Sequence, residues 1–413
     1  MNKAAVGVVG FDEALRMVLA QAANLAMPAT EPVSLLASED RMLAEAVHAD
    51  RDQPPFDRST RDGFAVRATD FGNGPLTIAG QIRAGEQWQG NALETGAAIG
   101  IMTGAPMPEG ADAVVMVEHV ERSGGVIRPL GERTLRRGEN IVRRGSEANA
   151  GQVVLPVGTL MEGAEIALAA ACGCSSLTVF RRPRVAIVAT GDELVEIDAV
   201  PQLQQIRNSN SYGLASLVAR AGGEAVRMPI APDRRAELEE IIRSARRCEL
   251  MLLSGGVSMG EYDLVEEVLE TLGAEFFFTG VKMQPGKPVV FGRLPAANGF
   301  PAQLFFGLPG NPVSTQVTFH CFVEPMLRAM AGAAVQGPRF AQATLAEDAK
   351  GKPGLMQVLP ARLTADRVRP EVRLVNWQGS GDLAANARAN CYAVLPPEKE
   401  RFPAGDVITI LLR

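Results

Sequence analysis

A continuous apolar run that passes directly into a glycine turn is the most restrictive feature of this chain. Residues 250–253, LMLL, are followed by SGGVSMGEYD at 254–263. Such a run is typical of a strand buried on both faces of a parallel sheet. The next apolar residues recur with helical spacing, at Leu264, Val265, Val268, Leu269 and Leu272. A strand, a turn and a helix in this order predict an open α/β sheet with a ligand at the carboxyl ends of its strands.

The turn itself carries the residue types that bind a phosphate group and its metal ion. Gly255 and Gly256 allow the backbone to approach a ligand closely. Ser254 and Ser258 add hydroxyl groups, and Asp263 adds a carboxylate. Backbone N–H groups at a helix start bind anionic oxygens, and carboxylates together with phosphate oxygens bind Mg²⁺. We therefore expect this turn to contact a phosphate-bearing ligand.

Residues 184–332 alternate between apolar strand patterns and amphipathic helix patterns. Helices are expected at residues 208–222, 233–245 and 312–330. Strands are expected at residues 185–189, 224–230, 250–253, 276–278, 289–291 and 303–306. This alternation predicts a mostly parallel sheet with helices on both faces.

Three further glycine-containing loops are expected at the same edge of the sheet, at residues 189–193, 283–288 and 307–314. In the last loop, which also contains Pro309 and Gly310, Asn311 is a good helix N-cap and Pro312 suits the first helical position. The free N–H groups of that helix start could hold an anion. A well-capped helix without a ligand is the alternative.

Lys287 lies between Gly286 and Pro288 and resembles part of a nucleotide-binding P-loop. The spacing from Gly280 is one residue too long, and Pro288 occupies a position that requires a hydroxyl residue. We therefore do not expect a P-loop ATPase. Lys287 either supplies a point charge to an oxyanion or is an ordinary surface lysine.

Four acidic residues accompany these loops: Asp192, Glu193, Asp233 and Asp263. Protein sites for Mg²⁺ use one or two carboxylates and leave several waters on the ion. Each acid also has a structural interpretation, and for Asp233 the N-cap of the following helix is the favoured one. We expect at least one of the four to bind a metal ion.

The rest of the chain predicts a multidomain α/β and β fold. Residues 1–50 and 145–180 are expected to form an elongated, discontinuous N-terminal domain, with one helix starting at residue 11 and a second over residues 35–47. Residues 51–144 are rich in glycine and short strand patterns, which indicates an inserted β-rich domain. Residues 181–332 are the α/β domain, and residues 337–413 a small β-barrel-like domain.

Composition excludes several classes of protein. The net charge of −6, without a dominant basic stripe, argues against nucleic-acid binding. The arginine-rich residues 133–144 are either a solvated face or a substrate rim. No apolar run approaches the ~20 residues that span a bilayer, and the first residues do not form an export signal, so we expect a cytoplasmic protein. Five scattered cysteines predict no disulfide framework.

Seven motifs in order resemble the MoeA/gephyrin family of molybdenum-inserting enzymes. They are PPFDRSTRDGFA, IMTGAPMPEGADAVVMVE, RVAIVATGDEL, RNSNSYGL, SGGVSMGEYD, MQPGKPVVFG and GLPGNPVS. The resemblance covers residues 8–332 well and the last domain loosely. It implies an elongated homodimer of four-domain subunits, a central MogA-like α/β domain, and adenylylated molybdopterin and molybdate as substrates. The implied reaction inserts molybdenum and releases AMP with Mg²⁺. Other proteins of molybdenum-cofactor synthesis are candidate partners.

The resemblance also assigns roles to matching residues. It implies catalytic roles for Asp62, Thr103, Glu193, Asp263 and Lys287, with Asp62 and Thr103 reaching the active site of the partner subunit. Metal binding is implied for Asp62, Glu193 and Asp263. The residues expected to bind the molybdopterin substrate are Ser254, Gly255, Gly256, Ser258, Asp233, Pro309, Gly310, Asn311, Pro312 and Ser380.

Some positions depart from the family pattern. Gln284 lies where many members have a lysine, and Lys282 is a nearby cation. Glu147 replaces an aspartate, and Phe64 replaces a tyrosine. Leu355 lies where an arginine is expected. These departures concern the anion site more than the fold, so a carrier or scaffold that binds molybdopterin without turnover is the alternative function.

Overall fold

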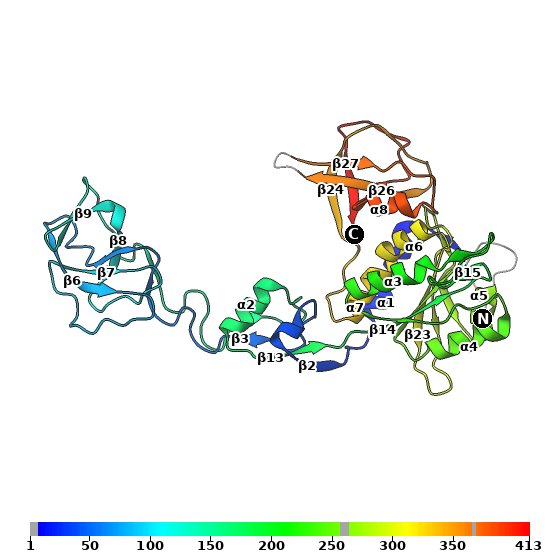
Figure 1. The fold of residues 1–413 in the computed structure, drawn as a ribbon, viewed down its shortest axis with the longest axis horizontal. Helices are drawn as coiled ribbons and strands as arrows, with labels where there is room; N and C mark the ends of the chain where they lie inside the picture. Colours follow the sequence, from blue (N-terminus) through cyan, green and yellow to red (C-terminus); the bar gives the residue numbers. More distant parts are fainter. Residues whose placement is uncertain (1–6, 257–263, 366–368) are drawn as a thin grey trace.

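The computed structural model describes residues 7–256, 264–365 and 369–413. The molecule is elongated, with a β-rich part at one end, the α/β sheet and the C-terminal sheet at the other, and a small connecting part between them (Figure 1). The chain passes from the connecting part into the β-rich part and back again. In the described residues, no helix is long and apolar enough to cross a membrane.

The central sheet has six strands in the order β17-β14-β18-β23-β22-β19. They are β14 (Arg184–Ala189), β17 (Glu224–Arg227), β18 (Leu250–Ser254), β19 (Glu275–Phe278), β22 (Val290–Leu294) and β23 (Gln303–Leu308). The first four strands in the sheet order are parallel, and β22 and β19 complete the sheet with antiparallel pairings. All residues of β18 and β23 are buried, as their continuous apolar sequences predict. The expected α/β fold with a mostly parallel sheet is confirmed.

The antiparallel direction of β22 explains how the loop at residues 283–288 reaches the ligand edge. Parallel strands place their carboxyl ends at one edge, but an antiparallel strand begins there. The 283–288 loop lies just before β22, whereas the other three loops follow β14, β18 and β23. The reversed strand therefore brings the 283–288 loop to the same edge as the other three loops, as the sequence predicts.

Helices cover both faces of this sheet. α3 (Ser209–Arg220), α6 (Pro312–Thr318) and α7 (Glu324–Met330) share one apolar core with α1 (Phe11–Ala23). α4 (Arg235–Ala245) and α5 (Leu264–Thr271) contribute to a second core on the other face. A π-helical turn, Phe319–Val323, joins α6 to α7, so residues 312–330 form the continuous helical segment that the sequence predicted.

The connecting part is built from short paired strands and one helix. Its elements are β2 (Thr30–Ser34), β3 (Val47–His48), β12 (Val153–Leu155), α2 (Gly163–Ala171) and β13 (Ser176–Phe180). The predicted second helix at residues 35–47 is wrong, because only the 3₁₀ turn Leu35–Ser38 forms. After this turn the backbone is extended, because Met42 and Leu43 form β-bridges with Leu160 and Val179.

The β-rich part is a six-stranded sheet in the order β8-β5-β7-β6-β10-β9. Its strands are β5 (Gly63–Val66), β6 (Leu76–Ile82), β7 (Ala97–Ile101), β8 (Ala113–Met116), β9 (Val120–Ser123) and β10 (Val126–Pro129).

Further short strand pairs lie outside the larger sheets. They include β4 (Arg58–Ser59) with β11 (Ile141–Val142), and β15 (Leu194–Val195) with β16 (Ile206–Arg207). The same holds for β1 (Val8–Val9) with β20 (Gly280–Val281) and for β25 (Ala349–Lys350) with β29 (Arg401–Phe402).

The C-terminal sheet includes a strand from outside the C-terminal part. Its order is β21-β26-β27-β24-β30-β28, with a further pairing of β26 and β28. The bounds are β21 (Met283–Gln284), β24 (Phe340–Leu345), β26 (Met356–Ala365), β27 (Pro370–Leu374), β28 (Cys391–Leu395) and β30 (Val407–Leu412), with the helix α8 (Leu383–Arg388). Because β21 pairs with β26, the loop at residues 283–288 is attached both to the α/β sheet and to the C-terminal sheet. This is the junction between the two sheets.

A buried carboxylate stabilises the same junction. Glu324, at the start of α7, is 8% exposed and receives a 2.7 Å contact from His320 Nδ1 and a 2.8 Å ion pair from Arg328. Arg339, in the segment leading to β24, lies 3.5 Å away. Burial raises the pKa of Glu324, but the hydrogen bond from His320 and the charges of His320, Arg328 and Arg339 outweigh it. The pKa is therefore held below its ordinary value of 4.5.

We predict that Glu324→Gln lowers the free energy of unfolding by about 3 kcal/mol at pH 7, because it removes the buried carboxylate that pairs with the buried His320 and with the partly exposed Arg328 and Arg339. A group with a depressed pKa stabilises the fold above its unfolded-state pKa and loses this effect as the pH falls through the folded-state value. The difference between the two proteins should therefore persist at pH 5 and shrink below 4.5.

The measurement is urea unfolding followed by tryptophan fluorescence. The matched control is Glu275→Gln, which removes an exposed ion pair with Arg293 and should cost less than about 1 kcal/mol. Equal effects of the two substitutions would contradict the role assigned to Glu324.

Candidate functional site

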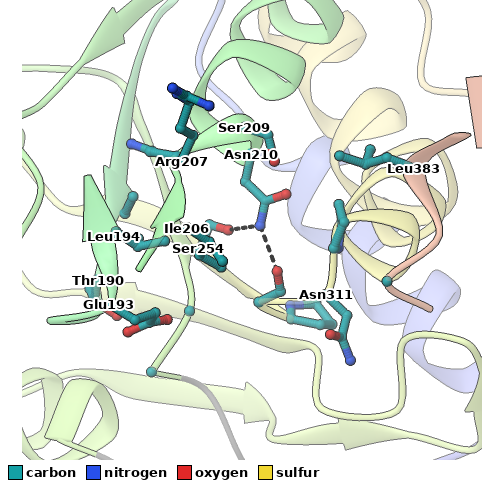
Figure 2. Close-up of a pocket in the computed structure, with 18 of the residues that line it drawn as sticks. Thr190, Glu193, Leu194, Ile206, Arg207, Ser209, Asn210, Ser254, Asn311 and Leu383 are labelled. Atoms are coloured by element: carbon teal, nitrogen blue, oxygen red, sulfur yellow. Dashed lines mark hydrogen bonds between the residues drawn. The ribbon is translucent and has the colours of Figure 1, made fainter. Parts of the chain in front are cut away.

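The predicted glycine loops surround one cavity of about 670 Å³ (Figure 2). Three of its walls follow β14, β18 and β23, and a fourth comes from the start of α3. The lining residues from these four walls include Thr190, Glu193, Asn210, Ser254, Gly255, Gly256, Pro309, Gly310, Asn311 and Pro312. The volume suits a drug-sized or nucleotide-sized ligand.

Asn210 joins two of the loops. Its side-chain Nδ2 donates to Ser254 Oγ at 2.9 Å and to the carbonyl oxygen of Gly310 at 2.8 Å (Figure 2). Asn208 caps α3 by accepting from the Ser211 backbone N–H, which fixes the first turn that carries Asn210. The amide therefore holds the ends of β18 and β23 at a constant separation.

The two glycines of the turn are required by their surroundings. Gly255 and Gly256 have φ values of +91° and +62°. A Cβ atom on Gly255 would lie 2.5 Å from the carbonyl oxygen of Thr190, and one on Gly256 would lie 2.7 Å from Thr190 Oγ1. Glycine is thus the residue that permits this left-handed turn against the neighbouring loop.

Two charged side chains line this cavity in the described chain. Glu193 reaches it from the loop after β14, and Arg207 reaches it from β16 (Figure 2). Arg207 donates to the carbonyl oxygens of Ile197 and Ala199, so its guanidinium is held on the adjoining loop. A carboxylate and a guanidinium are therefore both available at the rim.

A second, smaller cavity of about 360 Å³ adjoins the first. The two share Pro288, Pro309 and Asn311 as lining residues. The smaller cavity is formed by the 283–288 loop on one side and by the C-terminal residues Trp377, Gly379 and Ser380 on the other, and it also contains Ser314. Lys287 is its one charged lining residue in the part of the chain that the structure describes.

The start of α6 differs from the expectation in one respect. Pro312 occupies the first helical turn as predicted, but Asn311 makes no side-chain capping hydrogen bond. The backbone N–H of Val313 donates to the carbonyl oxygen of Ser380 at 2.9 Å. This donor is therefore not free for an anion, because the C-terminal part already uses it.

Asp233 is not the N-cap that the sequence suggested. α4 is preceded by Arg234, and Asp233 instead exchanges hydrogen bonds with Asp192 through their backbone N–H groups and carboxylates, at 3.2 and 3.4 Å. The helix begins later because residues 231–233 still follow the sheet edge, where Ala231 bridges to Thr190. Asp233 does not line either cavity.

Asp62 and Thr103 come together in the β-rich part. Asp62 Oδ1 accepts from the backbone N–H of Thr103 at 2.6 Å and from its hydroxyl at 2.8 Å. These hydrogen bonds lower the pKa of the Asp62 carboxyl, backbone donor first. The pair adjoins β5 and β7 of the β-rich part, which lies at the opposite end of the molecule from the α/β sheet whose loops line the cavities (Figure 1). A single chain thus does not bring Asp62 and Glu193 together.

Ser258 and Asp263 lie outside the described residues, so their predicted roles stay predictions. In the described ranges, no group of three histidine, cysteine, aspartate or glutamate side chains could hold a metal ion. Glu193 is the predicted metal ligand that lines the larger cavity in those ranges.

Sequence reasoning missed Asn210, Arg207 and Trp377 as lining residues. The sequence predicts a helix from residue 208, and the asparagines of RNSNSYGL at its start are a signal for a loop-bridging amide. Trp377 offered no comparable signal, because its position depends on how the C-terminal sheet docks on α6.

The departures from the family pattern fall in different places. Gln284 lines the smaller cavity, and its Oε1 accepts from Gln357 at 3.5 Å. Lys282 and Leu355 line neither cavity, so Lys282 does not replace a cation there. Glu147 forms a 2.9 Å ion pair with Arg58, far from both cavities.

Three family descriptions match successive parts of the chain. Residues 9–173 match "MoeA N-terminal region (domain I and II)", residues 186–329 match "Probable molybdopterin binding domain", and residues 342–412 match "MoeA C-terminal region (domain IV)".

Relatives of known name extend the match to nearly the whole chain. A protein of a Nostoc species named molybdopterin molybdenumtransferase is 40% identical over 74% of this chain and 70% of its own length. One of the same name from Haemophilus influenzae is 33% identical over 92% of this chain and 93% of its own. A solved structure of a molybdopterin biosynthesis MoeA protein from Pyrococcus horikoshii matches with a TM-score of 0.76 and 28% identity, covering 98% of this chain and all of that one. The chain therefore belongs to the MoeA family.

Proposed function

We propose that this chain is a molybdopterin molybdenumtransferase that inserts molybdenum into adenylylated molybdopterin and releases AMP. The observation that carries the proposal is the pair of adjoining cavities. One is large and lined by glycine turns, and the other is small and carries one lysine. The first suits a bulky phosphorylated ligand, and the second suits a compact oxyanion.

The larger cavity would hold the pterin and its pyrophosphate. The backbone N–H groups of Gly256 and Gly310 would face anionic oxygens, since glycine permits their close approach. The N–H of Gly255 already donates to the carbonyl oxygen of Leu308 at 3.3 Å. Asn210 keeps these two loops at a fixed separation. The turn and the Gly310 loop would then contact the pyrophosphate together, without a rearrangement of either loop.

Magnesium fits this cavity, because Glu193 offers one carboxylate and the substrate would supply phosphate oxygens. Asp263 is the second proposed ligand. When bound, the ion would neutralise charge that develops on the pyrophosphate as AMP leaves.

The smaller cavity would hold molybdate. Lys287 supplies a point charge, and the hydroxyl groups of Ser314 and Ser380 supply hydrogen-bond donors. Its shared wall with the larger cavity would bring the oxyanion beside the pterin dithiolene. Gln284 contributes an uncharged amide to this wall.

We further propose a homodimer in which the β-rich part of one subunit completes the site of the other. Asp62 and Thr103 are fixed to each other by two hydrogen bonds, yet they lie far from the cavities of their own chain. A two-fold arrangement would bring this pair to the partner's Glu193 cavity.

The decisive experiment incubates the purified protein with adenylylated molybdopterin, molybdate and Mg²⁺ and measures AMP. We expect AMP release that requires molybdate. Tight binding of the adenylylated substrate with no AMP release would instead establish the alternative, a molybdopterin carrier.

We predict that Glu193→Gln lowers the rate of AMP release by about 100-fold, since it removes a negative charge that would hold the ion. Glu196→Gln is the matched control. Glu196 is exposed, lies just after β15 and pairs only loosely with Arg227 at 3.8 Å. A similar loss in both variants would contradict a specific role for Glu193.

Mixed dimers test the proposed partner contribution. Asp62→Asn and Glu193→Gln should each be inactive alone, whereas mixing the two variants should restore about a quarter of wild-type activity, because half of the random dimers contain one intact site. No recovery in a preparation shown to contain mixed dimers would place both residues in the same subunit's site.

At Gln284, where many family members have a lysine, we predict a substitution that improves the use of molybdate. Gln284→Lys should lower the molybdate concentration for half-maximal activity by about tenfold, because it adds a second cation to the smaller cavity. Gln342→Lys on β24, outside both cavities, is the control for added positive charge. An equal effect of the two substitutions would show that net charge alone is responsible.

A further inference from the structure

The C-terminal loop at residues 376–382 forms part of both cavities. Trp377, Gly379 and Ser380 line the smaller cavity, and Gly381 lines the larger one together with Leu383 of α8. The opposite walls belong to the α/β sheet and α6. The width of the smaller cavity therefore depends on how firmly this loop is attached to α6.

The loop and α8 form one stiff unit. Asp382 accepts hydrogen bonds from the backbone N–H groups of Gln378 and Ala385, at 3.0 and 2.9 Å. Its own N–H donates to the carbonyl oxygen of Gly379 at 3.0 Å. A displacement of α8 would consequently move Ser380 as well.

Two hydrogen bonds attach this unit to α6. One is the backbone bond from Val313 N–H to Ser380, at 2.9 Å. The other joins two side chains: Asn386 Nδ2 on α8 donates to Gln316 Oε1 on α6 at 2.8 Å. The first bond uses a free N–H at the start of α6, and the second uses a side chain one turn further along the helix. Asn386 is 1% exposed, and its backbone carbonyl is fixed by Arg413 at 2.8 Å.

We propose that Gln316 and Asn386 are positioning residues that hold Ser380 and Trp377 against the smaller cavity and so set its affinity for an oxyanion. Neither residue lines either cavity, so any effect on binding is transmitted through the 376–382 loop. The proposal rests on the proposed function for the identity of the oxyanion, molybdate.

The chain contains its own reporter for this cavity. Its two tryptophans are Trp88 and Trp377. Trp88 belongs to the β-rich part, where its Nε1 donates to Asn91. In a Trp88→Phe background, the emission therefore reports on Trp377 alone, and titration with sodium molybdate measures binding without any turnover.

The test is a double-mutant cycle with Gln316→Met and Asn386→Leu, which keep approximate size but remove the hydrogen bond. Gln316→Met leaves the buried Asn386 amide without this partner, and Asn386→Leu leaves the half-buried Gln316 amide without it. Each should lower the thermal midpoint, the first by more, whereas the double variant should recover most of the loss. The half-saturating molybdate concentration should rise about tenfold in both single variants and stay raised in the double variant. Gln342→Met, on the exposed side of β24, should change neither quantity.

A purely structural role predicts a different pattern, in which molybdate affinity recovers together with the thermal midpoint in the double variant. That pattern, or unchanged affinity in the single variants, would overturn the proposal. Absence of any molybdate response in the parent protein would instead contradict the proposed function.

Hydrogen exchange tests the positioning without ligand. The amides of residues 376–383 should exchange faster in all three variants than in the parent. Unchanged exchange would overturn the proposal independently of molybdate.

Discussion

The candidate site depends on one topological constraint: the four glycine loops of the central sheet must lie at the same edge of that sheet. Three of the loops follow the carboxyl ends of the parallel strands β14, β18 and β23. The fourth loop lies just before β22, which is antiparallel to its neighbour and therefore begins at the same edge. The side chain of Asn210 then fixes two of the loops to each other. The large cavity is thus a consequence of strand direction, and one amide keeps its shape.

The second cavity depends on a different constraint, the docking of the C-terminal sheet. β21 belongs to that sheet although it precedes β22 in the chain, so the 283–288 loop is held from both sides. The junction is sealed by apolar residues of one continuous core, which includes Phe322, Met326 and Tyr392. Glu324 and its partners add charge pairing there. A site that spans this junction is therefore sensitive to the stability of the junction itself.

The sequence allowed the α/β sheet, its helices and the convergence of the glycine loops to be predicted, because buried parallel strands have continuous apolar sequences. Local errors arose where tertiary contacts outweighed local preference. Residues 35–47 carry a helical pattern, but β-bridges of Met42 and Leu43 to distant residues hold this segment extended. Asp233 is a typical N-cap residue, yet its carboxylate accepts a hydrogen bond from the backbone N–H of Asp192. Trp377 and the use of Val313 N–H could not be foreseen, because both depend on docking between distant segments.

The central claim is that the Ser254–Gly256 turn and the Gly310 loop bind the pyrophosphate of an adenylylated pterin. A crystal structure of the protein with adenylylated molybdopterin tests it most directly. We expect pyrophosphate oxygens within hydrogen-bond distance of the Gly256 and Gly310 backbone N–H groups, with the pterin extending toward Lys287. A substrate bound elsewhere, with its pyrophosphate in solvent or on the C-terminal sheet, would contradict it.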